Sequence, residues 1–303
     1  MEGVLLIMFK RGIVLCAVLI IGLGALVSGC GDIIEDEEGL EIGMVAWACA
    51  EAQTYVAKVV LEDHMDYDVT VTTLEPAAVY SALSEGDLDI FMAAWLPVTH
   101  EDYWDEYGDV LNQHNAHYDG ARIGLTVPDY VDIDSIEELN EHADMFDGEI
   151  VGIDAGAGIM RATEDAMDVY DMDDLELIES SDIAMAAALG DAIMADEPIV
   201  VTGWTPHWKF AEYDLKFLED PEQVYGEAEQ IYAVSRPGFP EINPDVSGLL
   251  DRFTLDDEDV GEVMAAIEDG EEPIDAARAW VEANEDVVDQ WLPELELEEP
   301  EVE

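Results

Sequence analysis

Two successive runs of short apolar segments and amphipathic segments constrain this fold more than any other feature of the sequence. The first run predicts strands at residues 42–47, 69–74 and 88–95 and helices at 51–64 and 77–83. The second run predicts strands at residues 150–154, 175–180 and 198–203 and helices at 159–170 and 183–195. Strands that alternate with helices in this order form parallel sheets covered by helices. We therefore expect an α/β protein of two lobes with largely parallel sheets.

The segments outside the two runs indicate how the lobes are connected. Residues 122–128 and 231–237 are placed where the chain has to cross between lobes, and residues 244–292 have helical periodicity. We expect this helical segment to pack back on the first lobe. The predicted organisation is a first lobe of residues 41–126 plus 237–292, a second lobe of 127–236 and an acidic tail of 293–303.

Acidic side chains dominate the charge of the chain. There are 74 Asp and Glu residues against 10 Lys and Arg residues, for a formal net charge of −64, yet 50% of the residues are hydrophobic and a core can form. Such a surface repels nucleic acid and anionic headgroups, which excludes both as partners. Acidity spread over every segment with only four lysines favours a protein adapted to molar salt, where the Debye length is ~3 Å. An acidic protein of an ordinary organism is the weaker alternative.

Residues 1–29 have the organisation of a secretory signal peptide. Lys10 and Arg11 precede the uncharged segment 12–27, and small residues follow it. This segment is short for a membrane-spanning helix, which needs ~20 apolar residues. A retained anchor helix is therefore the weaker interpretation.

The segment Val27-Ser28-Gly29-Cys30 resembles the lipobox of exported lipoproteins, in which the cysteine is lipidated after cleavage. It predicts lipid attachment at Cys30, an acidic tether over residues 30–40 and a location on the extracellular face of the cell membrane. Cys16 would leave with the signal peptide, so Cys49 would be the remaining thiol and the mature chain could form no internal disulfide.

Tryptophan ends three of the predicted strands. Ligands bind beyond the carboxyl ends of parallel strands, and Trp47, Trp95 and Trp204 stand at such ends. A core position is the ordinary interpretation of one tryptophan, but three equivalent positions from both lobes favour a shared role. Indole faces attract cations at ~0.5–2 kcal/mol each and can surround a quaternary ammonium group, which has no hydrogen-bond donor. We predict that these three side chains form an aromatic cage for such a cation.

Two further segments carry candidate groups for an anion. The loop 154–160 places two glycines before a helix start, where backbone N–H groups can reach a carboxylate; a tight turn is the plain alternative. The loop lacks the third glycine of a dinucleotide fingerprint, and no Walker lysine follows. His100, five residues after Trp95, can donate to a carboxylate, with charge assistance if protonated, or can cap a helix. The same two interpretations apply to His207, and for Trp208 the plain interpretation is packing against the lobe.

Four segments resemble motifs of the glycine betaine-binding proteins of ABC importers. They are Gly43-Met44-Val45-Ala46-Trp47, Ala94-Trp95-Leu96-Pro97-Val98-Thr99-His100, Gly152-Ile153-Asp154-Ala155-Gly156-Ala157-Gly158-Ile159-Met160 and Thr202-Gly203-Trp204-Thr205-Pro206-His207-Trp208. The resemblance covers residues 41–292 and implies a two-lobe periplasmic-binding-protein-like fold with a hinge and a ligand cleft between the lobes.

The same resemblance implies a role for each motif. The trimethylammonium group would lie within Trp47, Trp95 and Trp204, and the carboxylate would be held by the backbone amides of Gly158 and Ile159 and by His100.

Two features depart from the family pattern. The lobes follow the reverse chain order of some members, a circular permutation that should preserve the site. Ala48-Cys49-Ala50-Glu51 follows the first tryptophan where an acidic residue is common, which leaves the choice among betaines open.

A binding function is favoured over catalysis. With 74 carboxylates, sets such as Asp89, Asp154, Glu51 and His100 arise by chance, and no serine elbow or Cys/His metal spacing is present in the sequence. We expect no enzymatic activity, no cofactor and no metal.

The predicted function is that of an extracellular substrate-binding protein for glycine betaine or a related quaternary-ammonium osmolyte. Its partners would be the permease and ATPase of an ABC importer. Presentation of the ligand to a membrane chemotaxis transducer is the alternative, since the binding site would be the same. The groups for a carboxylate argue modestly against choline.

Overall fold

The computed structural model describes residues 39–292 of the chain. The predicted signal peptide of residues 1–29, the predicted lipid-attachment residue Cys30, most of the predicted tether and the predicted tail of residues 293–303 lie outside these described residues.

Both predicted series fold as strands joined by helices. The first consists of β1 (Leu40–Met44), α1 (Ala48–Met65), β2 (Val69–Thr73), α2 (Pro76–Glu85) and β3 (Ile90–Leu96). The second consists of β5 (Glu149–Val151), α4 (Gly158–Val169), β6 (Glu176–Ile178), α5 (Asp182–Ala195) and β7 (Val201–Thr205). Strand β1 is parallel to β2 and β3, and β5 is parallel to β6 and β7. We call the parts built on these two series lobe A and lobe B.

Hydrophobic spacing explains why α1 forms and which side it buries. Val56, Val59 and Val60 recur at the three- and four-residue spacing of a helix, and each is 0% exposed. The helix therefore buries an apolar stripe in the core of lobe A.

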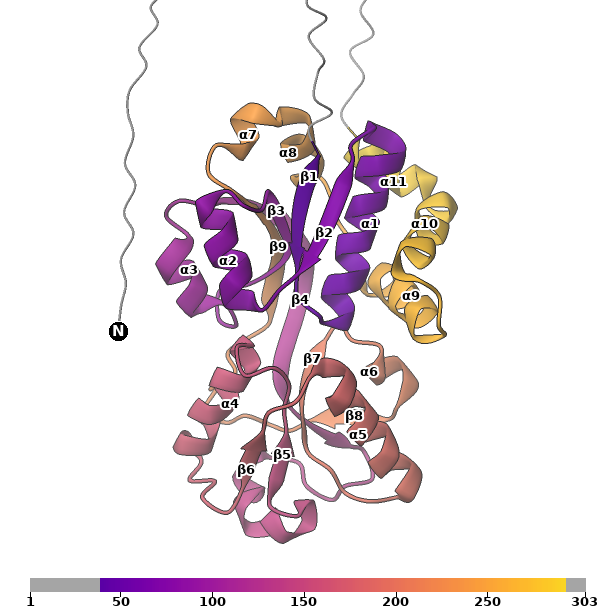
Figure 1. Ribbon diagram of the computed structural model, residues 1–303. Coiled ribbons are helices and arrows are strands. Elements are labelled where there is room, and N and C mark those ends of the chain that lie inside the picture. The colour runs from indigo at the N-terminus through magenta and orange to yellow at the C-terminus, as the bar shows by residue number, and fades with distance from the viewer. Residues whose placement is uncertain (1–38, 293–303) are drawn as a thin grey trace, which may run out of the picture. The chain divides into compact units, whose positions relative to one another are not determined.

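Two strands carry the chain between the lobes. The first part of β4 (Asn112–Pro128) pairs with β9 (Glu229–Ser235), and its last part pairs with β7 and with β8 (Leu215–Phe217). A continuous path β2-β1-β3-β9-β4-β7-β5-β6 thus runs through both lobes (Figure 1).

The expectation of largely parallel sheets is correct only inside each series. Four of the eight strand pairings among the described residues are antiparallel, namely β3–β9, β4–β9, β4–β7 and β4–β8. All four involve β4 or β9, the strands that cross between the lobes. A crossing strand runs in the direction opposite to that of the strands beside which it lies.

The remaining elements cover the sheets. They are α3 (Glu101–Tyr107), the short 3₁₀ segments Ile136–Glu138 and Asn140–Phe146, α6 (Lys209–Glu212), α7 (Phe239–Ile242), α8 (Pro244–Leu250), α9 (Asp257–Glu268), α10 (Pro273–Ala283) and α11 (Glu285–Trp291). Helices α9 and α10 pack on α1 of lobe A (Figure 1). Trp280 of α10 stacks on Trp291 of α11 with 6.0 Å between ring centroids, and both are buried.

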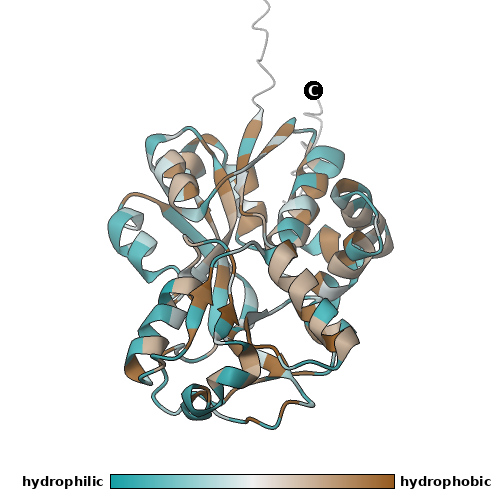
Figure 2. Ribbon diagram, turned by 60° about the horizontal axis from the view of Figure 1, so that its bottom comes forward, coloured by the Kyte–Doolittle hydropathy of each residue, from teal (hydrophilic) through white to brown (hydrophobic). Residues whose placement is uncertain are grey.

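Hydropathy follows this layering. Figure 2 shows apolar residues concentrated along the strands and polar residues in the connecting loops and outer helix turns. Within residues 39–292, no helix combines the length and the apolar character that a membrane crossing requires.

Candidate ligand-binding site

The three predicted cage tryptophans surround one small cavity between the lobes. Trp95 lies in β3, Trp204 lies in β7, and Trp47 is the residue before the first turn of α1, three residues beyond the end of β1. Their exposed fractions are 2%, 3% and 6%. The cavity is lined by Trp47, Trp95, Thr99, Ile123, Ile153, Ala157, Gly158, Ile159 and Trp204. Its volume in this structure is ≈ 20 Å³.

The glycine loop brings a helix start to the same cavity. Helix α4 begins at Gly158, and Ala157 precedes it in an extended conformation without capping by its side chain. The first N–H groups of a helix have no intrahelical acceptor and carry the positive end of the helix dipole. The amides of Gly158 and Ile159 are therefore suited to an anion at the cavity wall.

Gly158 is required for the close approach of the two lobes. A Cβ atom at this position would lie 1.8 Å from the backbone oxygen of Thr99, which belongs to the turn after β3. Only glycine permits this contact, which places the start of α4 directly against lobe A.

His100 is fully buried beside the cage rather than in the cavity lining. Its ring centroid lies 5.8 Å from that of Trp47. The backbone N–H of Trp95 donates to Nδ1 at 3.2 Å, and the Tyr80 hydroxyl lies 3.1 Å from the same atom. Because Nδ1 accepts, the proton is on Nε2, which has no hydrogen-bond partner among the described residues.

The charge state of His100 determines which kind of donor it offers. Burial, with a smaller effect from Arg161, lowers the pKa of His100 to about 3, so the imidazole is neutral at physiological pH. It offers an uncharged Nε2–H donor, not the charge-assisted contact of an imidazolium. His100 also stands at the start of α3 without capping it through its side chain.

A buried glutamate that sequence reasoning missed holds the turn that leads to His100. The backbone N–H groups of Val98 and Thr99 donate to Glu229 Oε1 at 2.6 and 2.9 Å, and Glu229 is 2% exposed. Its local sequence, at the start of β9, carries no signal that separates it from the other carboxylates of the chain.

A polar cluster behind Trp204 was only partly expected. His207 Nδ1 accepts from the backbone N–H of Lys209 at 3.1 Å, so Nε2–H donates to Asp182 Oδ1 at 2.8 Å. The His207 ring stands edge-on to Trp204 with 4.8 Å between centroids. Burial lowers the pKa of His207 to about 4, and this residue supports the cage wall without lining the cavity.

Asp182 also connects the two lobes. Its Oδ2 accepts the backbone N–H of Ala48, next to Trp47, at 3.0 Å. Burial opposes ionisation, but the His207 hydrogen bond and the charge of Lys209 hold the pKa of this carboxyl below its usual value. No role was predicted from the sequence for Asp182 or Lys209. The scarcity of lysine in the chain was a signal that could have drawn attention to Lys209.

Further contacts close the lobes on the cavity. The Tyr103 hydroxyl donates to the Gly156 carbonyl at 2.8 Å, and Arg161 donates to the Val98 carbonyl at 3.1 Å and pairs with Asp102 at 3.1 Å. These contacts join α3 and the turn after β3 to the glycine loop and α4, so the structure has the closed arrangement of its lobes.

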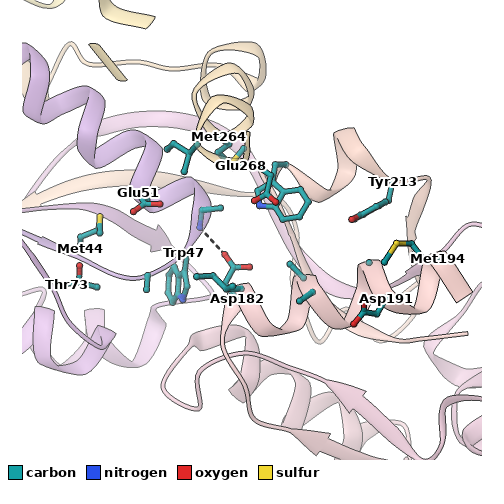
Figure 3. A pocket seen from close by; sticks show the side chains of 18 residues that line it. Met44, Trp47, Glu51, Thr73, Asp182, Asp191, Met194, Tyr213, Met264 and Glu268 are labelled. Atoms are coloured by element: carbon teal, nitrogen blue, oxygen red, sulfur yellow. Dashed lines mark hydrogen bonds between the residues drawn. The ribbon is translucent and has the colours of Figure 1, made fainter. Parts of the chain in front are cut away.

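A larger groove of ≈ 530 Å³ is also lined by Trp47 (Figure 3). Asp182 and Glu51 line it, and burial together with the Asp182 charge raises the pKa of Glu51. Trp47 is the only one of the six residues predicted to contact the ligand that lines this groove, although Trp208 also lines it, so the small cavity is the candidate site. Within residues 39–292 no group of three or more His, Cys, Asp or Glu side chains could hold a metal ion.

The chain matches a family model and a curated relative. The family model described as the substrate-binding domain of ABC-type glycine betaine transport systems matches residues 38–283. The glycine betaine/carnitine transport binding protein GbuC of Listeria monocytogenes is 44% identical over 178 residues, which span 58% of this chain and only 57% of that relative.

Two solved structures share the fold. Lactococcal OpuAC, in a closed conformation complexed with glycine betaine, has a TM-score of 0.81 and 35% identity, covering 84% of this chain and 100% of that one. An ABC-transporter choline-binding protein in complex with choline has a TM-score of 0.79 and 27% identity, covering 84% of this chain and 91% of that one.

Proposed function

The chain belongs to the family of substrate-binding domains of ABC-type glycine betaine transport systems, and we propose that it captures glycine betaine or a closely related betaine for an ABC importer. The observation that carries this proposal is the meeting of the cage tryptophans with the Gly158 and Ile159 amides at one cavity. The first group suits a quaternary ammonium, and the second suits a carboxylate.

The aromatic cage would hold the cationic end of the ligand. Trp47 and Trp95 come from lobe A and Trp204 comes from lobe B, so the cage is complete only when the lobes are closed. A trimethylammonium group offers no hydrogen bond, and indole faces can stabilise it without one.

The carboxylate would be bound at the opposite end of the cavity. The Gly158 and Ile159 amides stand at the start of α4, and the neutral His100 has a buried Nε2–H without a partner. N–H donors available to an anion at this end of the cavity favour betaines over choline, which has a hydroxyl in place of the carboxylate.

Hinge closure would couple binding to transport. The ligand bridges the lobes and therefore favours the closed state by its differential affinity for the two states. The membrane permease would recognise this closed form. The family and the named relatives are transport proteins, which favours import over presentation to a chemotaxis transducer.

Placement outside the membrane, with lipid attachment at Cys30, is part of the same proposal. It rests on the signal-like segment and the lipobox of the sequence. The lysine-poor, acidic composition supports a working environment of molar salt, in which self-repulsion is screened.

Calorimetric titration of the purified protein in molar KCl tests the proposal. Saturable binding of glycine betaine with a weak choline response is the expected result. Choline binding without betaine binding would keep the cage and remove the carboxylate site at Gly158, Ile159 and His100. A folded protein that binds neither compound would contradict the ligand assignment.

A further inference from the structure

Lys209 places a second cation against the aromatic cage. Its Nζ lies 3.8 Å from the centroid of the Trp204 ring and 5.7 Å from that of Phe210. The residue is 0% exposed, and Nζ has no hydrogen-bond partner among the described residues. A buried ammonium with three unused donors is costly, so its position calls for a physical explanation.

The ammonium contacts Trp204 from outside the cavity lining. Trp204 lines the cavity, whereas the fully buried Lys209 does not. A ligand cation in the cage and the Lys209 ammonium would therefore both lie against the same indole.

Three titratable groups face Lys209. Asp182 comes from α5, Cys49 comes from α1, and His207 belongs to the turn before α6. Asp182 already accepts from His207 and from Ala48. Since Cys49 and Ala48 belong to lobe A, closure of the lobes completes the burial of the ammonium.

Resting on the proposed betaine-binding function, we infer that Lys209 sets the cation affinity of the cage, and that ligand binding with lobe closure expels a proton from its ammonium. The protonated side chain repels the quaternary ammonium across Trp204 and competes for the same π-system. The neutral amine does neither. The N–H bond breaks, its electron pair stays on Nζ, and the proton passes to the buffer.

The neighbouring groups leave Lys209 as the one that titrates near neutrality. Burial lowers the pKa of Lys209 to about 7, while burial lowers the pKa of His100 to about 3 and that of His207 to about 4. Burial raises the pKa of Cys49 to about 12. Protonation of Lys209 should therefore weaken binding as the pH falls through about 7.

Coulomb's law gives the size of the effect. For two cations separated by about 8 Å with the indole between them, an effective dielectric constant of about 20 corresponds to a repulsion of roughly 30-fold in affinity. The ligand carboxylate offsets part of this repulsion, so we expect about tenfold for glycine betaine.

Titration calorimetry tests the inference with glycine betaine as the probe. The affinity should rise about tenfold between about pH 5.5 and about pH 8.5. Near pH 7, the buffer takes up the released fraction of a proton, and its ionisation heat adds to the measured heat of binding. The heats measured in phosphate and in Tris should therefore differ. Lys209→Met should bind with an affinity that is independent of pH and without proton release. Lys216→Met removes a lysine that pairs with Asp134 away from the cage and should behave as the wild type.

Two results would overturn the inference. One is saturable wild-type binding without pH dependence or proton release; the other is unchanged proton release in Lys209→Met. The wild-type measurement decides the question alone if the variant fails to fold. Absence of betaine binding at every pH would instead contradict the proposed function on which the inference rests.

Discussion

Replacing Gly158 by alanine should block lobe closure while leaving the cage side chains intact. The added Cβ would lie 1.8 Å from the Thr99 oxygen and 2.7 Å from the Thr99 carbonyl carbon, where real Cβ contacts stay above 3.0 Å. The start of α4 and the turn after β3 must then separate by more than 1 Å, from 3.0 − 1.8. Both partners are backbone atoms, so no rotamer change relieves the overlap.

The cost should lie at the upper end of the range for overpacking, which is ~1–3 kcal/mol. At about 1.4 kcal/mol per tenfold change, this predicts a loss of roughly 100-fold in betaine affinity. Alanine is a better helix former than glycine, so lobe B should fold as before. Calorimetry measures the affinity, and small-angle X-ray scattering at saturating betaine reports the closure.

Gly156 supplies the matched control in the same loop. A Cβ atom there would meet the Tyr103 hydroxyl at 3.8 Å, an ordinary contact. Gly156→Ala should therefore bind betaine within about threefold of the wild type, a change below 1 kcal/mol. If folded Gly158→Ala bound betaine as tightly as Gly156→Ala, the close approach of the lobes would not matter for binding and the reasoning would be refuted.

Three further predictions concern side chains. Trp204→Ala should weaken betaine binding severely, whereas Trp280→Ala, which removes a stacked core ring, should lower the melting temperature with affinity retained; equal affinities in the two folded variants would contradict the cage. In a Lys209→Met background, betaine affinity should stay flat between about pH 5.5 and about pH 8.5 because the low pKa of His100 keeps it neutral there; a decline above pH 6.5 in titration calorimetry would show that the imidazolium is required. The pKa of Lys209 is lower in the fold than in the unfolded chain. The burial of its ammonium therefore lowers the free energy of unfolding by the full amount below about pH 7, and by less as the pH rises toward 10.5. Thermal melts should therefore show Lys209→Met stabilised over the wild type at pH 6, with the gain shrinking by pH 10.

Local periodicity was sufficient to predict most elements of each lobe. The predicted helix 51–64 lies inside α1 (Ala48–Met65), and the predicted strand 69–74 matches β2 (Val69–Thr73) within one residue. Trp47 was placed at a strand end but stands at the start of α1, since β1 ends at Met44. Such boundaries depend on hydrogen bonds to other segments, which periodicity does not reveal.

The direction of the crossing strands could not be predicted in the same way. The spacing located the crossings near residues 122–128 and 231–237, but the antiparallel pairing of β4 with β7 and β9 depends on which strands meet across the sheet.

Local spacing and side-chain chemistry were enough to establish the α/β class, the two series and the residue types able to hold a cation and a carboxylate. The tertiary structure alone decided that Trp47, Trp95 and Trp204 meet at one cavity. It also decided that His100 is neutral and that Lys209 lies against Trp204. Charge states and ring contacts depend on desolvation by segments distant in the chain, and only folding brings those segments together.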